Sequence, residues 1–129
     1  MTGPPRIRID LASGAPVVRQ IADQLRVLLV EGALKPGTAL PSVRRVAIDL
    51  GVHFNTVAEA YRQLAEEGWL DLKHGRAAMV VERAMPAAAN HKVADFRQRL
   101  RQLISQMRAA GLPMEKIVDE LLAQAGRKK

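Results

Sequence analysis

The chain of 129 residues has a net charge of +7, no cysteine, and 48% hydrophobic but only 3% aromatic residues. This length and composition suit one folded domain with a small appendage, and they exclude a disordered chain, disulfides, thiol chemistry and a membrane-spanning helix. The basic balance favours an acidic partner, nucleic acid first, and the absence of a secretion signal leads us to expect a cytoplasmic protein.

The positive charge is concentrated in the last third of the chain. Residues 1–83 hold 11 Lys or Arg and 9 Asp or Glu, whereas residues 84–129 hold 9 and 4. The first part is therefore close to neutral. Any contact that it makes with phosphate groups must come from a few well-placed arginines and from backbone N–H groups.

The first elements in chain order are a strand and a helix. Basic and apolar residues alternate over residues 6–10, which predicts a short strand beside a later hairpin. Pro16 suits the first position of a helix, and apolar residues at helical spacing predict that helix over residues 17–32. A turn at residues 35–37 follows, and residues 38–40 are compatible with a short strand.

Two short helices separated by a glycine turn form the centre of the sequence. Apolar residues on one face predict the first over residues 42–50 and the second over residues 55–67, with Val57, Ala60, Tyr61 and Leu64 on the inward face of the second. Gly51 stands where a helix would end in the left-handed conformation. This layout is typical of a DNA-binding helix-turn-helix, and strands predicted over residues 69–73 and 77–82 would add the hairpin of a winged helix.

The composition changes after Val81, which predicts a DNA-binding domain at residues 1–83, a hinge at 84–91 and a helical tail at 92–129. Helices are predicted over residues 92–110 and 114–125. Such short helices bury little surface alone, so they would fold back on the domain or pair with a second chain. We favour a homodimer formed through apolar residues spaced for a two-helix contact: Val93, Phe96, Leu100, Leu103, Met107, Ile117 and Leu121.

Ordered motifs run through the helix-turn-helix and hairpin: Leu40-Pro41-Ser42, Leu50-Gly51-Val52, Asn55-Thr56-Val57 and Glu67-Gly68-Trp69-Leu70. Together with Ser13-Gly14 and Gln20-Ile21 upstream, they resemble the DNA-binding domain of the GntR family of bacterial transcriptional regulators. The short remainder after the hairpin is similar to the YtrA-type subfamily. The resemblance implies a mainly α fold with a small antiparallel β wing, followed by a two-helix dimerisation tail.

The resemblance also implies where DNA would bind. The recognition helix, residues 54–67, would enter the major groove, and the wing, residues 73–77, the minor groove. Arg44 is expected to contact DNA rather than solvent alone, while Asn55 or Thr56 could cap the helix as well as contact DNA. The expected contact residues are Arg44, Arg45, His53, Phe54, Asn55, Thr56 and Arg62 in the helices and Lys73, His74, Gly75 and Arg76 in the wing.

Two positions depart from the family pattern, because Phe54 and Ala58 stand where many members carry arginine. Phe54 would either touch a thymine methyl group or pack against the turn. Losing two arginines lowers the direct base readout that we expect from the recognition helix.

We therefore expect a homodimeric repressor that binds an inverted-repeat operator in double-stranded DNA. The alternative is a non-specific nucleoid-associated protein, which the pI near 10.6 favours. No nucleophile–base set or carboxylate pair indicates catalysis, and the histidines lack metal-ligand spacing, so we expect no enzyme activity, cofactor or metal. A small-molecule effector, if there is one, would bind at the dimer interface or between the tail and the winged helix.

Overall fold

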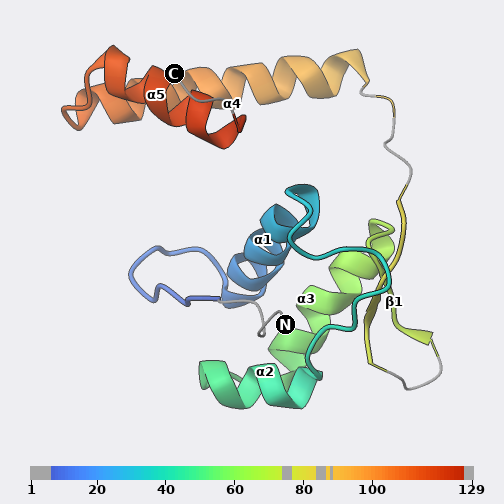
Figure 1. Ribbon diagram of the computed structural model, residues 1–129. Coiled ribbons are helices and arrows are strands. Elements are labelled where there is room, and N and C mark those ends of the chain that lie inside the picture. Colours follow the sequence, from blue (N-terminus) through green and yellow to red (C-terminus); the bar gives the residue numbers. More distant parts are fainter. Residues whose placement is uncertain (1–6, 74–76, 84–86, 88, 127–129) are drawn as a thin grey trace. The chain divides into compact units, whose positions relative to one another are not determined.

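The computed structural model describes residues 7–73, 77–83, 87 and 89–126 (Figure 1). This described part is mainly helical, with five helices and one two-stranded antiparallel sheet, which confirms the predicted fold class. The chain divides into two compact units, Met1–Ala84 and Met85–Lys129, and each is described by itself below. Within the described residues no helix is both long and apolar enough to cross a membrane.

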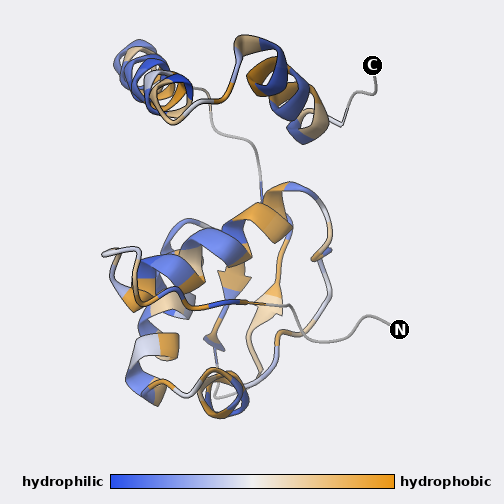
Figure 2. Cartoon of the chain, turned by 90° about the vertical axis from the view of Figure 1, so that its left-hand side faces the viewer, coloured by the Kyte–Doolittle hydropathy of each residue, from blue (hydrophilic) through white to orange (hydrophobic). Residues whose placement is uncertain are grey.

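Helix α3 (Phe54–Glu66) is the centre of the first unit, because it packs against α1 (Val17–Val30), α2 (Val43–Leu50) and β1 (Leu70–Asp71). Hydrophobic and hydrophilic residues alternate around these helices (Figure 2). Burying one large aliphatic side chain contributes about 1.5–3 kcal/mol, so this core stabilises the unit. The predicted inward face of α3 is buried, as are its partners on α1 and α2: Val57, Ala60, Tyr61, Leu64, Ile21, Leu25, Val46 and Ala47.

The turn between α2 and α3 has the predicted geometry. Ser42 caps α2, and its hydroxyl accepts a hydrogen bond from the Arg45 backbone N–H at 3.1 Å. Gly51 ends the helix with a φ of 70°, and the Val52 N–H donates to the Ala47 carbonyl at 3.0 Å. A side chain with a Cβ would be strained at this φ, so glycine is needed to turn the chain directly into α3.

The hairpin is shorter than predicted. Strand β1 pairs with β2 (Met79–Val80) over two residues, and Ala39 adds an isolated bridge to Met79 where the short third strand was predicted. The ladder ends after β1 because the Asp71 carboxylate accepts a hydrogen bond from the Lys73 N–H at 2.9 Å, which turns the chain away from its partner. The pairing is retained where Leu70 and Val80 are buried against α3.

The strand predicted over residues 6–10 is wrong for the described residues 7–10, which form no strand. Two glutamine side chains of α1 bind this extended segment instead. The Gln24 amide exchanges two hydrogen bonds with the backbone of Arg8, at 2.7 and 2.9 Å. The Gln20 amide does the same with Asp10, at 2.7 and 3.0 Å. These amides satisfy the backbone groups that a neighbouring strand would otherwise pair.

The second unit consists of α4 (Asn90–Ala109) and α5 (Met114–Gln124), which fold back on each other (Figure 1). Helix α4 begins two residues earlier than predicted, inside the proposed hinge. Ile117 is the only buried residue among those described in this unit. Large apolar side chains along α4 stay exposed, namely Val93, Phe96, Leu100 and Leu103, and so do Val118 and Leu121 of α5.

Candidate nucleic-acid interface

Helix α3, the second helix of the pair, begins with a histidine cap. The Nδ1 atom of His53 accepts a hydrogen bond from the Asn55 N–H at 3.1 Å, and the His53 carbonyl accepts one from the Thr56 N–H at 3.0 Å. The sequence offered Asn55 or Thr56 as the cap, and that interpretation is wrong. Because His53 supplies the cap, the exposed Asn55 side chain does not serve as one.

The cap determines the hydrogen-bonding character of the His53 ring. A nitrogen that accepts a hydrogen bond carries no hydrogen, so the neutral ring carries its hydrogen on Nε2. The exposed ring stacks on Phe54, with centroids 5.1 Å apart and an angle of 23° between the planes. Phe54 is itself 51% exposed, so it does not sink into the turn. The start of α3 thus presents a ring donor and an open aromatic face.

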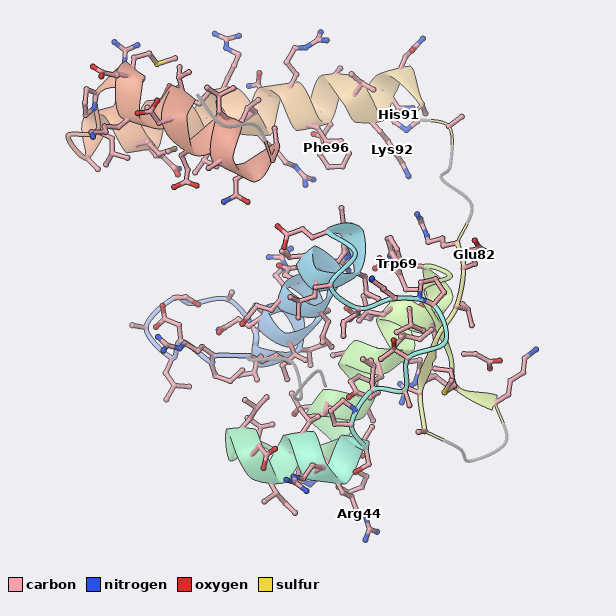
Figure 3. The ribbon with its side chains drawn as sticks, viewed as in Figure 1. Arg44, Trp69, Glu82, His91, Lys92 and Phe96 are labelled. Atoms are coloured by element: carbon pink, nitrogen blue, oxygen red, sulfur yellow. The ribbon has the colours of Figure 1, made fainter. Side chains whose placement is uncertain are left out.

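The arginines of the helix-turn-helix differ in whether an acidic side chain already forms an ion pair with them. Arg45 lies 3.4 Å from Asp49 on the same helix, and Arg62 forms an ion pair with Glu59. Arg44 is exposed and points away from the helices (Figure 3), and among the residues that the structure describes no ion pair involves it. Exposed pairs are weak, yet each holds its arginine near an acidic group. Arg44 is therefore the most available of these charges.

The described residues of the proposed wing are Lys73 and Ala77. Both are exposed, while His74, Gly75 and Arg76 lie outside the described residues. The antiparallel pairing of β1 with β2 places Lys73 beyond the end of the ladder, where its ammonium group is open to solvent.

Sequence reasoning missed an ion pair that joins α1 to the end of α3. Arg26 binds the Glu67 carboxylate with two hydrogen bonds, at 2.8 and 2.6 Å, and also pairs with Asp23. The hydrogen bond from Arg26 lowers the pKa of the Glu67 carboxyl, and the Trp69 side chain and the charge of Arg83 act in the same direction. The two partners are 41 residues apart in sequence, so no local spacing could have indicated the pair.

No cluster of three or more metal-ligating side chains occurs in the part of the chain that the structure describes. What the first unit presents is a helix pair with an exposed polar leading edge and a short hairpin beside it. This arrangement defines the class of winged helix-turn-helix DNA-binding proteins.

Comparison with known proteins identifies the family. Residues 17–80 match the family described as bacterial regulatory proteins, gntR family. The chain is 36% identical to the HTH-type transcriptional repressor YtrA of Bacillus subtilis over 111 residues, which is 86% of this chain and 85% of that protein. The chain therefore belongs to the GntR family of DNA-binding transcriptional regulators. The family and this relative are regulators of transcription rather than enzymes.

Solved structures share this fold. YtrA from Sulfolobus acidocaldarius, a GntR-family transcription factor, is 38% identical and superposes with a TM-score of 0.57, covering 80% of this chain and 97% of that one. The DNA-binding domain of AraR, solved in complex with operator ORX1, shares the fold at 17% identity, with a TM-score of 0.53 over 62% of this chain and 100% of that one.

Proposed function

We propose that this protein is a homodimeric repressor that binds an inverted-repeat operator in double-stranded DNA. In this proposal α3 lies in the major groove, and wing residues 73–77 lie in the adjacent minor groove. The observation that carries the proposal is the exposed first turn of α3 beside an Arg44 without an ion-pair partner among the described residues. Helix-turn-helix proteins place this end of the second helix against base edges.

Each exposed group at this edge suits a particular feature of DNA. Asn55 can bind adenine through two hydrogen bonds, and the Nε2–H of His53 can donate to guanine N7 or O6 or to a phosphate. Phe54 would pack on a thymine methyl group. Arg44 would read guanine or bind phosphate, with Arg45 and Arg62 as weaker phosphate contacts. Thr56 is the remaining expected contact residue in the N-terminal turn of α3. It is half-buried, and its N–H already donates to the His53 carbonyl.

Dimerisation is supported by the exposed apolar face of α4, which α5 of the same chain does not cover. Its residues Val93, Phe96, Leu100 and Leu103 are 39–61% exposed, and Leu121 of α5 is 44% exposed. The two helices also differ in charge, because α4 carries five Lys or Arg and one Asp, whereas α5 carries three Asp or Glu and one Lys. Helix α4 of one chain against α5 of a second chain would pair opposite charges as well as apolar residues. Ile117 and Met107 were predicted for the dimer contact, but Ile117 is fully buried within the chain, so in this proposal these two residues hold α5 on its own α4.

Two further expectations accompany this proposal. A repressor of this kind would act in the cytoplasm, at the nucleoid. The effector expected at the dimer interface, or between the tail and the winged helix, stays a prediction.

The test is selection of binding sites from random duplex DNA by the full-length chain. We expect an enriched inverted repeat. Arg44→Ala should weaken binding to it by about 10- to 100-fold, the loss of one base-reading contact. The matched control Arg45→Ala should change binding by less than about threefold, because Asp49 already pairs with that side chain. Asn55→Ala should relax the preference at one base pair of each half-site.

The charge of the tail favours a second candidate, a non-specific nucleoid-associated protein. Such a protein would yield no enriched sequence, and its affinity would fall steeply with salt. Equal losses for Arg44→Ala and Arg45→Ala, without an enriched repeat, would contradict the repressor and support this alternative.

A further inference from the structure

At the point where the chain leaves the first unit, it is held by side chains that the proposed DNA contacts do not use. Arg83 is the last described residue before residues 84–86, and its Nε–H donates to the Glu67 carbonyl at 2.7 Å. Its guanidinium lies over the Trp69 ring, 4.7 Å from the centroid. Its stem lies against Gly68, where an added Cβ would be 3.7 Å from the Arg83 Cγ. Three consecutive residues thus hold one arginine side chain.

The same point of the fold is bound to α1. Glu67 is the C-terminal cap residue of α3, and its carboxylate accepts the two hydrogen bonds from Arg26. Arg83 therefore binds a carbonyl at the end of the recognition helix, where a positive charge is favourable. We call Arg26, Glu67, Trp69 and Arg83 the exit cluster. Trp69 and the neighbouring Glu82 are labelled in Figure 3.

We propose that Arg83 is a positioning residue that fixes where the chain leaves the recognition helix and thereby sets the spacing between half-sites that the dimer accepts. This inference rests on the proposed function, since only a dimer on two half-sites has a spacing to select. Its basis is that Arg83 joins α3, which would read the bases, to the connection that leads into the dimerising tail.

Covalent geometry gives the size of the effect. From Arg83 to Asn90, the start of α4, a fully extended chain spans at most about 24 Å. Without the Arg83 contacts, the last residue held is Val81, whose N–H donates to the Trp69 carbonyl at 3.0 Å. The span from Val81 to Asn90 is at most about 31 Å. Losing the Arg83 contacts would thus lengthen the tether of each subunit by about 7 Å at most. This is the length of about two base pairs of DNA.

The experiment uses the full-length chain and duplexes built from the half-site that the selection supplies. One duplex carries a single half-site, and the others carry two half-sites whose separation is changed by one base pair at a time. Binding is measured for the unmodified chain, for Arg83→Ala and Arg83→Lys, and for the adjacent control Glu82→Ala. Arg83→Lys keeps the charge but loses the Nε–H and the planar group that stacks on Trp69.

We expect the unmodified chain and Glu82→Ala to prefer one separation. Arg83→Ala and Arg83→Lys should tolerate changes of about two base pairs with a several-fold smaller penalty, because the tether is longer and the effective concentration of the second domain depends less on the separation. Their affinity for the single half-site should stay within about twofold of the unmodified chain. Fluorescence of Trp69, the only tryptophan, should also shift toward the solvent-exposed value.

Two results would overturn the inference. An unchanged spacing profile in Arg83→Ala would show that the exit point does not limit the dimer. An equal loss of affinity on one and two half-sites would show that Arg83 only stabilises the domain. If the unmodified chain binds two half-sites no better than one, the proposed dimeric function fails instead, and the two failures are thereby distinguished.

Discussion

The two units of this protein differ in how far each buries its own apolar side chains. The first unit has a continuous core drawn from three helices and the hairpin, with Ile21, Leu25, Val57 and Leu64 almost fully buried. In the second unit, Ile117 is the only described residue that reaches this state, and a row of large side chains along α4 is exposed. The first unit is thus organised by its own packing, whereas the tail has apolar surface that its own helices do not cover.

The largest expected effect comes from placing a charge on the exposed face of α4. Leu100→Arg should abolish dimerisation, and affinity for the two-site operator should fall by about 100- to 10,000-fold, because the second domain no longer binds as part of one molecule. The matched control Gln98→Arg adds the same charge on the opposite face of α4 and should leave the dimer intact. Analytical ultracentrifugation and operator binding check both variants. A monomer from Gln98→Arg as well would mean that charge alone disrupts the tail.

Core truncations sharpen the comparison between the units. Leu64→Ala should lower the free energy of unfolding of the first unit by about 2–5 kcal/mol, because it leaves a cavity in a packed core. Leu103→Ala, studied at concentrations where the chain is monomeric, should change it by less than about 0.5 kcal/mol. Urea unfolding followed through Trp69 fluorescence measures the first unit alone, since the tail has no tryptophan. Similar losses in both variants would show that the units unfold together.

A smaller effect is expected from the Arg26–Glu67 pair, and it depends on pH. Because the pKa of Glu67 is lowered in the folded chain, its contribution to stability is complete above the ordinary value of 4.5 and is lost as the pH falls through the lowered folded value. Glu67→Gln should cost about 1 kcal/mol or less at pH 7 and should weaken the loss of stability in acid. Urea unfolding at a series of pH values tests this prediction. The control is Glu66→Gln, a substitution of the exposed neighbouring residue. Identical acid profiles for Glu67→Gln and the unmodified chain would contradict the assignment.

The smallest expected effect comes from the ionisation of Tyr61 at high pH, and it leaves the stability at neutral pH unchanged. Burial raises the pKa of Tyr61 to about 12, and its hydroxyl donates to the Pro41 carbonyl at 2.7 Å. The stability that the neutral phenol contributes is complete below about pH 10 and is lost as the pH rises toward the folded value. Because the chain has one tyrosine, its ultraviolet titration reports Tyr61 alone. We expect no tyrosinate at pH 10 in the folded chain but a midpoint near 10 in urea, and equal midpoints would refute the burial effect.

Local patterns were enough to predict the helices and the turn between α2 and α3. The left-handed Gly51 and the inward face Val57, Ala60, Tyr61 and Leu64 depend on neighbours within one or two helical turns. Such features follow from spacing and residue type alone. Helix α3 was therefore located correctly to within one residue at each end.

Features that depend on distant partners were not predicted. The N-terminal alternation of Ile7 and Ile9 is typical of a strand, but the partner that the fold supplies is a helix with glutamine side chains. The exit cluster joins residues of α1, the end of α3 and the chain after β2, which no short window of sequence contains. His53 was missed as the cap because serine, threonine, asparagine and aspartate are the usual caps.

The two glutamines on α1 show that side chains of a helix can make the backbone hydrogen bonds that a neighbouring β-strand would otherwise make. Residues four apart on a helix rise by about 6 Å, and residues two apart on an extended chain advance by about 6.6 Å. Gln20 and Gln24 therefore match the repeat of Asp10 and Arg8, each amide replacing one peptide group of a missing strand. Since these bonds involve only the backbone of residues 8 and 10, they place no requirement on the side chains there, whereas they depend on the length of each glutamine side chain.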